Sequence, residues 1–286
     1  MKKFAMIYHV LLSLSFIPLN AQTVGHLVII GGGDKPGPVI EKIVSLAGGA
    51  DAKIIVIPNA SYEPVESAVY QIDEFKSFGS KNVEYISFSK ETADDDSVIN
   101  KLDDAKGIYF CGGDQSRLTA DLLGTHLLDR IREIYRDGGV ISGTSAGAAV
   151  MSEVMITGNE LVNKDSSEIF NMIEKGNVET TQGFGFVTKA VIDQHFIKRK
   201  RNNRLITVIL EHPDLLGIGI DESTAILVNP DDTFEVLGES QVIIYNPHKT
   251  DGIKINNEGK ISVNNLIMNI LVEGQKFDMN KCQIIE

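Results

Sequence analysis

The chain contains little of what indicates a disulfide scaffold. Its 286 residues include only two cysteines and no tryptophan. Cys111 and Cys282 allow at most one cross-link, so a hydrophobic core must hold the fold together. Both cysteines stand in apolar sequence, which favours buried free thiols, and whether they pair stays open.

Positive charge is also scarce. There are 27 Lys and Arg residues against 39 Asp and Glu, which gives a net charge of −12. A surface that binds phosphates needs clustered basic residues, so nucleic acid is not an expected partner. The chain also lacks the spaced His and Cys groups of a zinc site, and Gly31 to Lys35 is not followed by the Gly-Lys-Ser/Thr of a phosphate loop. We therefore expect no metal and no cofactor.

The N-terminus has the pattern of an export signal. Lys2 and Lys3 precede an apolar stretch over residues 4–17, and Ala21 stands before Gln22. This order is typical of a secretory signal peptide, and the run is short for a membrane anchor. We expect residues 1–21 to be the signal and residues 22–286 a single domain, secreted to the periplasm or the exterior and free of the membrane after cleavage.

Apolar segments alternate with helical segments through the first half of the chain. Strands are predicted over residues 26–30, 53–57, 83–88, 107–111 and 139–142, and helices over 36–46, 63–78, about 98, and 116–135. Strands that are apolar throughout indicate a mostly parallel sheet with helices on both faces. Short strands and turns beyond residue 235 predict a β-rich C-terminal extension of this α/β fold.

Small polar residues follow four of the predicted strands, at residues 31–34, 58–61, 112–115 and 143–145. The carboxyl ends of parallel strands meet at one edge of a sheet, where ligands bind. The last of these segments begins Gly143-Thr-Ser145-Ala-Gly147, a G-x-S-x-G pattern between a strand and a helix. That context predicts an exposed nucleophilic serine on a tight turn.

A serine nucleophile needs a base and a group that orients the base. His195 is the last of three polar residues that end an apolar strand, so it is the best candidate among the histidines. The orienting acid is less clear from the sequence. Glu160 follows the nucleophile's helix, whereas Asp221 and Glu222 end another apolar strand.

Basic residues cluster directly after His195, from Lys198 to Arg204. Arg201 and Arg204 are three residues apart, so on a helix both can face the same side. Arginine forks bind carboxylates through two hydrogen bonds, which suggests a substrate that carries carboxylate groups. A solvated helix surface is the alternative interpretation.

Four motifs, in this order and spacing, resemble those of cyanophycinases. They are Gly112-Gly-Asp-Gln115, Gly143-Thr-Ser-Ala-Gly-Ala148, Asp193-Gln-His-Phe196 with the arginines that follow, and Gly217-Ile-Gly-Ile-Asp-Glu222. The wider group contains serine peptidases such as aspartyl dipeptidase, with a class-I glutamine-amidotransferase-like fold. The similarity runs from Gly31 to about Phe277.

The resemblance implies roles for individual residues. Ser145 would be the nucleophile and His195 the base, with Glu160 as our match for the acid, although the loop at residues 158–182 also holds Glu168, Glu174 and Glu179. The N–H groups of Gly113 and Ala146 would form the oxyanion hole. Substrate contacts would come from Gln115, Asp193, Gln194, Arg199, Arg201 and Arg204.

The implied activity is that of a serine exopeptidase acting on cyanophycin, a poly-aspartate with arginine on each β-carboxyl, to release β-Asp-Arg dipeptides. The alternatives are a secreted peptidase for short aspartyl or isoaspartyl peptides, and an inactive homologue that only binds. Retention of Ser145, His195 and the arginines disfavours the inactive homologue. A homodimer is compatible with the sequence, which does not fix the oligomeric state.

Overall fold

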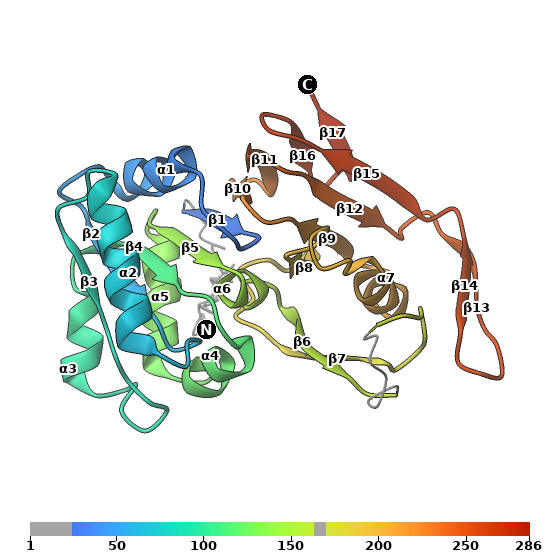
Figure 1. The fold of residues 1–286 in the computed structure, drawn as a ribbon, viewed down its shortest axis with the longest axis horizontal. Helices are drawn as coiled ribbons and strands as arrows, with labels where there is room; N and C mark the ends of the chain where they lie inside the picture. Colours follow the sequence, from blue (N-terminus) through green and yellow to red (C-terminus); the bar gives the residue numbers. More distant parts are fainter. Residues whose placement is uncertain (1–24, 163–169) are drawn as a thin grey trace, which may run out of the picture.

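A nine-stranded mixed sheet runs across the molecule in the computed structural model, which describes residues 25–162 and 170–286 (Figure 1). The predicted signal segment and Glu168 lie outside the described residues. The strand order is β17-β16-β11-β10-β1-β5-β4-β2-β3. Five neighbouring strands in this order, β1, β5, β4, β2 and β3, are parallel, and β10 pairs antiparallel with β1. The strands are β1 His26–Ile30, β2 Lys53–Ile57, β3 Val83–Tyr85, β4 Ala105–Phe110, β5 Val140–Thr144, β10 Thr224–Val228, β11 Thr233–Gly238, β16 Lys276–Asp278 and β17 Gln283–Ile285.

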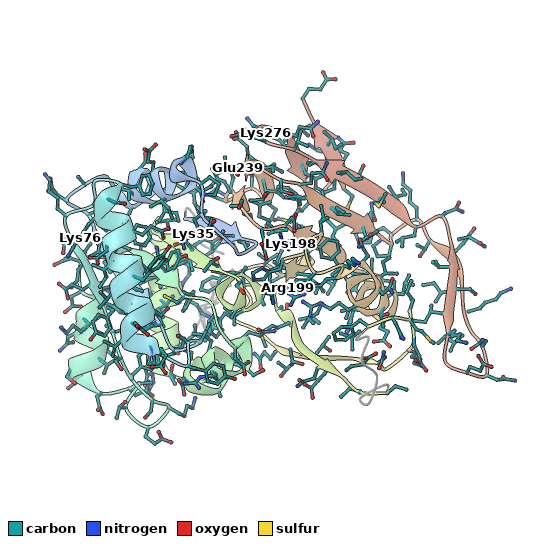
Figure 2. All side chains as sticks on the ribbon, viewed as in Figure 1. Lys35, Lys76, Lys198, Arg199, Glu239 and Lys276 are labelled. Atoms are coloured by element: carbon teal, nitrogen blue, oxygen red, sulfur yellow. The ribbon has the colours of Figure 1, made fainter. Side chains whose placement is uncertain are left out.

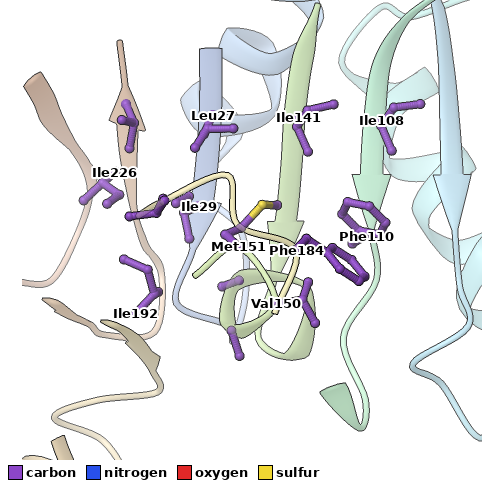
Figure 3. Packing of buried hydrophobic residues seen from close by; sticks show 14 of the residues in the cluster. Leu27, Ile29, Ile108, Phe110, Ile141, Val150, Met151, Phe184, Ile192 and Ile226 are labelled. Carbon is purple, nitrogen blue, oxygen red and sulfur yellow. The ribbon is translucent and has the colours of Figure 1, made fainter. Parts of the chain in front are cut away.

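Helices cover both faces of this sheet, as the apolar strands predict. Apolar side chains of α1 (Gly37–Ala47) and α2 (Pro64–Ser77) form a core on one face. The other face packs against α4 (Gln115–Leu122), α5 (His126–Arg136) and α6 (Ala146–Ala149). Figure 3 shows Val150 and Met151, just after α6, in this second core. The short α3 (Asp96–Ile99) continues into a 3₁₀ turn at Asn100–Leu102.

A second, four-stranded sheet lies beside the first, in the order β15-β12-β9-β8. Its strands are β8 Ala190–Gln194, β9 Leu216–Ile220, β12 Val242–Asn246 and β15 Ile267–Leu271, and α7 (Asn202–Glu211) packs on one face. Two hairpins extend from this half of the molecule (Figure 1): β6 Val154–Glu160 with β7 Val178–Gln182, and β13 Asp251–Ile255 with β14 Ile261–Asn264. The α/β class and the β-rich C-terminal part are therefore confirmed.

The predicted helix over residues 116–135 is instead two helices. The chain breaks at Gly124, whose φ of +76° favours glycine. Thr125 then caps α5, because its side-chain oxygen accepts a hydrogen bond from the Leu128 N–H at 3.2 Å. Both cysteines are free thiols, so the core and not a cross-link holds this fold. No helix among the described residues has the length and apolar character to cross a bilayer.

Candidate active site

Ser145 occupies a strained turn between β5 and α6. Its φ of 55° and ψ of −110° are unusual for a residue with a side chain, and its N–H donates to the Ile30 carbonyl at 3.0 Å. The two flanking glycines allow the turn to be this tight. A Cβ on Gly143 would lie 2.6 Å from the Gly147 carbonyl oxygen, and one on Gly147 would lie 2.3 Å from that of Phe110. The G-x-S-x-G pattern thus has a steric basis.

His195 and Glu222 form a hydrogen-bonded chain with this serine. His195 Nε2 lies 2.9 Å from Ser145 Oγ, and His195 Nδ1 lies 2.6 Å from Glu222 Oε1. An ionised Glu222 accepts the Nδ1 proton, which leaves the Nε2 lone pair to accept the serine hydroxyl. The His195 side chain is 8% exposed and that of Glu222 is 26% exposed, so the contact is largely removed from water.

The acid beside His195 is therefore Glu222, and the prediction of Glu160 is wrong. Glu160 ends β6 and is buried, where its carboxylate accepts hydrogen bonds from Asn177 Nδ2 at 2.6 Å and from the Phe170 N–H at 3.2 Å. Proximity in sequence to Ser145 misled the assignment, because β6 leads into a hairpin that extends away from α6 (Figure 1).

Strand pairing brings Glu222 to His195. β8 and β9 are parallel neighbours, and Gln194 pairs with Ile220 at their carboxyl ends. The residues just beyond both ends must then lie close together. Asp221 completes this junction, since its Oδ1 accepts the N–H groups of Ile197 and Lys198 at 3.0 and 2.9 Å.

The glycine-rich turn after β1 forms hydrogen bonds with the turns that carry His195 and Glu222. The Gly31 carbonyl accepts the His195 N–H at 2.7 Å, and the Gly32 carbonyl accepts the Ser223 N–H at 3.0 Å. Gly32 has a φ of +107°, and a Cβ there would lie 2.3 Å from His195 Cε1. Only glycine fits between the main chain and the imidazole ring.

Burial lowers the pKa of His195 below its usual 6.5. The hydrogen bond that His195 donates to Glu222 opposes this shift, while the positive charges of Arg199 and Arg201 add to it. The imidazole is consequently neutral at pH 7, which is the state that can accept a proton from Ser145.

The Gly112-Gly113 turn lies next to Ser145. A Cβ on Gly112 would lie 3.3 Å from the Ser145 Cβ, and one on Gly113 would lie 2.1 Å from the Ala60 carbonyl oxygen. Across the described ranges, no carbonyl or side chain accepts the N–H of Gly113 or of Ala146. Both amides are available beside the serine hydroxyl, where the resemblance places an oxyanion hole.

The predicted substrate-binding arginines divide into two groups. Arg204 is buried with Asp193, and its Nε donates to Asp193 Oδ2 at 2.7 Å while its Nη2 donates to Oδ1. Asp193 Oδ1 also lies 3.8 Å from Arg201 Nη1, so the structure shows Arg204 and Asp193 buried and bound to each other where we predicted substrate contacts. The pair instead supports the end of β8, which carries Gln194 and His195.

Arg201 and Arg199 remain candidates. Arg201 donates from Nη1 to the Gln194 carbonyl at 2.8 Å, and burial together with the Arg204 charge lowers its pKa to about 10. Arg199 is exposed on the same turn (Figure 2). The Gln194 side chain reaches the site, with Oε1 3.5 Å from Ser145 Oγ.

Gln115 is buried, and its side-chain amide nitrogen holds the main chain of β6, while its contact with substrate stays a prediction. Its Nε2 donates to the carbonyls of Ile156 and Thr157 at 2.9 and 2.6 Å. It therefore fixes β6 against the start of α4.

Among the described residues, no group of three or more His, Cys, Asp or Glu side chains could hold a metal ion.

A strained serine, a neutral histidine and two free amides at the ends of parallel strands define a serine-type hydrolase. Residues 27–236 match Peptidase family S51, and the chain belongs to this family of serine-type peptidases. The cyanophycinase of Synechococcus elongatus is 34% identical over 268 residues, covering 91% of this chain and 81% of that protein. The cyanophycinase of Geminocystis herdmanii is 34% identical over 259 residues, covering 88% and 92%. The resemblance seen in the motifs is thereby confirmed.

The fold also matches a solved structure. A peptidase from an acI-B1 actinobacterium superimposes with a TM-score of 0.66 at 22% identity, over 90% of this chain and 98% of that one. This similarity supports the arrangement of sheets and helices described above.

Proposed function

We propose that the protein is a secreted exopeptidase that hydrolyses cyanophycin and releases β-Asp-Arg dipeptides. The observation that carries the proposal is the hydrogen-bonded chain Ser145–His195–Glu222 in a protein similar over most of its length to cyanophycinases. Glu222 takes the place of Glu160, which the sequence favoured as the acid, and the chemistry of a Ser-His-Glu triad is otherwise unchanged.

In the first half of the reaction, Ser145 Oγ attacks an aspartyl main-chain carbonyl as its proton moves to His195 Nε2. Glu222 stabilises the imidazolium that forms, since its carboxylate already accepts the Nδ1 proton at 2.6 Å. The negative oxygen of the tetrahedral intermediate fits beside the N–H groups of Gly113 and Ala146. The imidazolium then protonates the departing amine, and an acyl ester on Ser145 remains.

In the second half, His195 takes a proton from water, and the resulting hydroxide attacks the ester and frees the aspartyl carboxylate. The low pKa of His195 keeps it neutral and ready for both steps. Ser145 regains its proton, and the enzyme returns to its starting state.

The arginyl groups of the polymer explain the basic residues beside the site. Each arginine of cyanophycin carries a free α-carboxylate, which an arginine fork can bind through two charge-assisted hydrogen bonds. Arg201 lies next to Gln194, and Arg199 stands exposed on the same turn. We propose that these two arginines hold that carboxylate. Secretion is proposed from Lys2, Lys3 and the apolar run that follows.

The test uses purified mature protein with insoluble cyanophycin, and mass spectrometry of the soluble products. Wild type should release β-Asp-Arg, and Ser145→Ala should release none while it keeps its thermal midpoint. Release of dipeptide by Ser145→Ala would refute the nucleophile. Cleavage of a short isoaspartyl peptide without any cleavage of the polymer would favour the alternative substrate class.

A further inference from the structure

A pocket of about 690 Å³ lies beside the catalytic turns and has no role in the mechanism above. Its walls come from the start of α1, the turn between β11 and β12, and the segment after β15. The lining residues are Pro36, Pro38, Gly238, Glu239, Ser240, Gln241, Val272 and Glu273.

Direct hydrogen bonds connect the pocket wall to the turn that carries Glu222. The Glu239 N–H donates to the Ser223 carbonyl at 2.9 Å, and Ser240 Oγ donates to Asp221 Oδ2 at 2.8 Å. From the other side, Gly33 contacts Glu222, and the chain reaches Pro36 three residues later. The pocket is therefore built on the same turns as the triad.

The described residues that line the pocket include two carboxylates, Glu239 and Glu273, and no Lys or Arg. Within the described ranges, neither Glu239 nor Glu273 forms an ion pair. The nearby cations have other partners, since Lys35 binds Glu74 at 3.1 Å and Lys276 lies 3.9 Å from Glu235. Pro36, Pro38 and Val272 supply the apolar part of the lining.

The charges around the triad are thus divided. Figure 2 shows Glu239 higher in the view than Lys198 and Arg199, so the acidic and basic side chains stand apart. A substrate group with both a carboxylate and a cation would match this division, and each arginyl group of the proposed polymer is such a group. The apolar wall suits the methylene stem of arginine, and carboxylates suit its guanidinium.

We propose that this pocket is a subsite for the guanidinium of an arginyl side chain of the bound substrate, with Glu239 and Glu273 as its acceptors. The inference rests on the proposed function and adds the location at which the cationic end of the substrate is recognised. It predicts that the protein distinguishes arginine from citrulline, in which a neutral urea replaces the guanidinium at almost the same size.

The experiment measures binding, so that it does not depend on turnover. A short synthetic oligomer of β-Asp-Arg and its citrulline analogue are titrated into Ser145→Ala by calorimetry. The same titrations are repeated with Ser145→Ala proteins that also carry Glu239→Gln, Glu273→Gln or both. Exposed ion pairs are individually weak, so we expect each substitution to lower the affinity for the arginine oligomer about threefold and both together to lower it about tenfold. Binding of the citrulline oligomer should stay within about twofold in every variant.

Glu258→Gln is the matched control. It makes the same change of charge between β13 and β14, where Glu258 is exposed and paired with Lys260, and it should leave both affinities unchanged. An equal loss for the two oligomers, no loss in the double variant, or no binding of either oligomer would overturn the subsite. Cleavage of the arginine oligomer by wild type is followed separately. Its absence would refute the proposed function, whereas the difference between the two oligomers decides the subsite.

Discussion

Replacing Glu222 with glutamine should reveal which acid serves His195. The carboxylate of Glu222 accepts the Nδ1 proton at 2.6 Å and so directs the Nε2 lone pair toward Ser145. An amide at this position can donate its own N–H to Nδ1, which places the ring proton on Nε2. The histidine then can no longer accept the serine proton.

The expected loss is large because both the orientation of the ring and the stabilisation of the imidazolium disappear. In triad enzymes, the equivalent change lowers kcat by about 10⁴. Glu222 is partly exposed, so water can replace some of its effect, and we expect a loss of about 10³. That corresponds to about 4 kcal/mol of transition-state stabilisation.

The control is Glu160→Gln, which alters a buried carboxylate of equal size. Its hydrogen bonds with Asn177 and the Phe170 N–H make it structural, so the free energy of unfolding should fall by about 1–3 kcal/mol. Its kcat should stay within a few-fold of wild type at temperatures where it is folded. Steady-state hydrolysis of a β-Asp-Arg oligomer and urea unfolding measure the two quantities. A folded Glu160→Gln that is inactive, beside an active Glu222→Gln, would refute the assignment.

Three further predictions concern the surroundings of the triad. Because the pKa of His195 is lowered, kcat/KM should persist as the pH falls through 6.5 and decline only at lower pH. Arg199→Ala removes a repelling charge and should move that decline to higher pH. The same pH profile in wild type and Arg199→Ala would contradict this. Gly32→Ala, whose Cβ would lie 2.3 Å from the His195 ring, should lower kcat at least about a hundredfold, and wild-type turnover would refute the steric argument. Arg201→Ala should lower kcat/KM on the polymer about ten- to a hundredfold, with only partial recovery in Arg201→Lys, and equal activity of all three proteins would leave Arg201 without a role in binding.

The predicted site residues that the structure brings together are those that carry their own local signal. Ser145 lies in a pattern whose glycines are required by the turn itself, and His195 follows an apolar strand. The parallel sheet was also readable from the strands, because each is apolar along its whole length. In these cases the information lies within about ten residues of the position concerned.

The assignments that failed depend on contacts between distant segments. Glu222 meets His195 only because β8 and β9 pair in a particular register, which no local pattern states. Helical spacing predicts that Arg204 faces substrate, yet Asp193 of the adjacent strand β8 pairs with it. The partner of a charged side chain depends on the packing, because burial decides whether the charge faces substrate or another side chain.

The triad also joins the two sheets of the molecule. Ser145 follows a strand of the larger sheet, His195 follows a strand of the smaller one, and Glu222 lies in the connection between them. A slide of one sheet past the other by about an ångström would separate the serine hydroxyl from the imidazole while every strand stayed paired. The proposed catalysis therefore depends on the alignment of the two sheets, which share one apolar core.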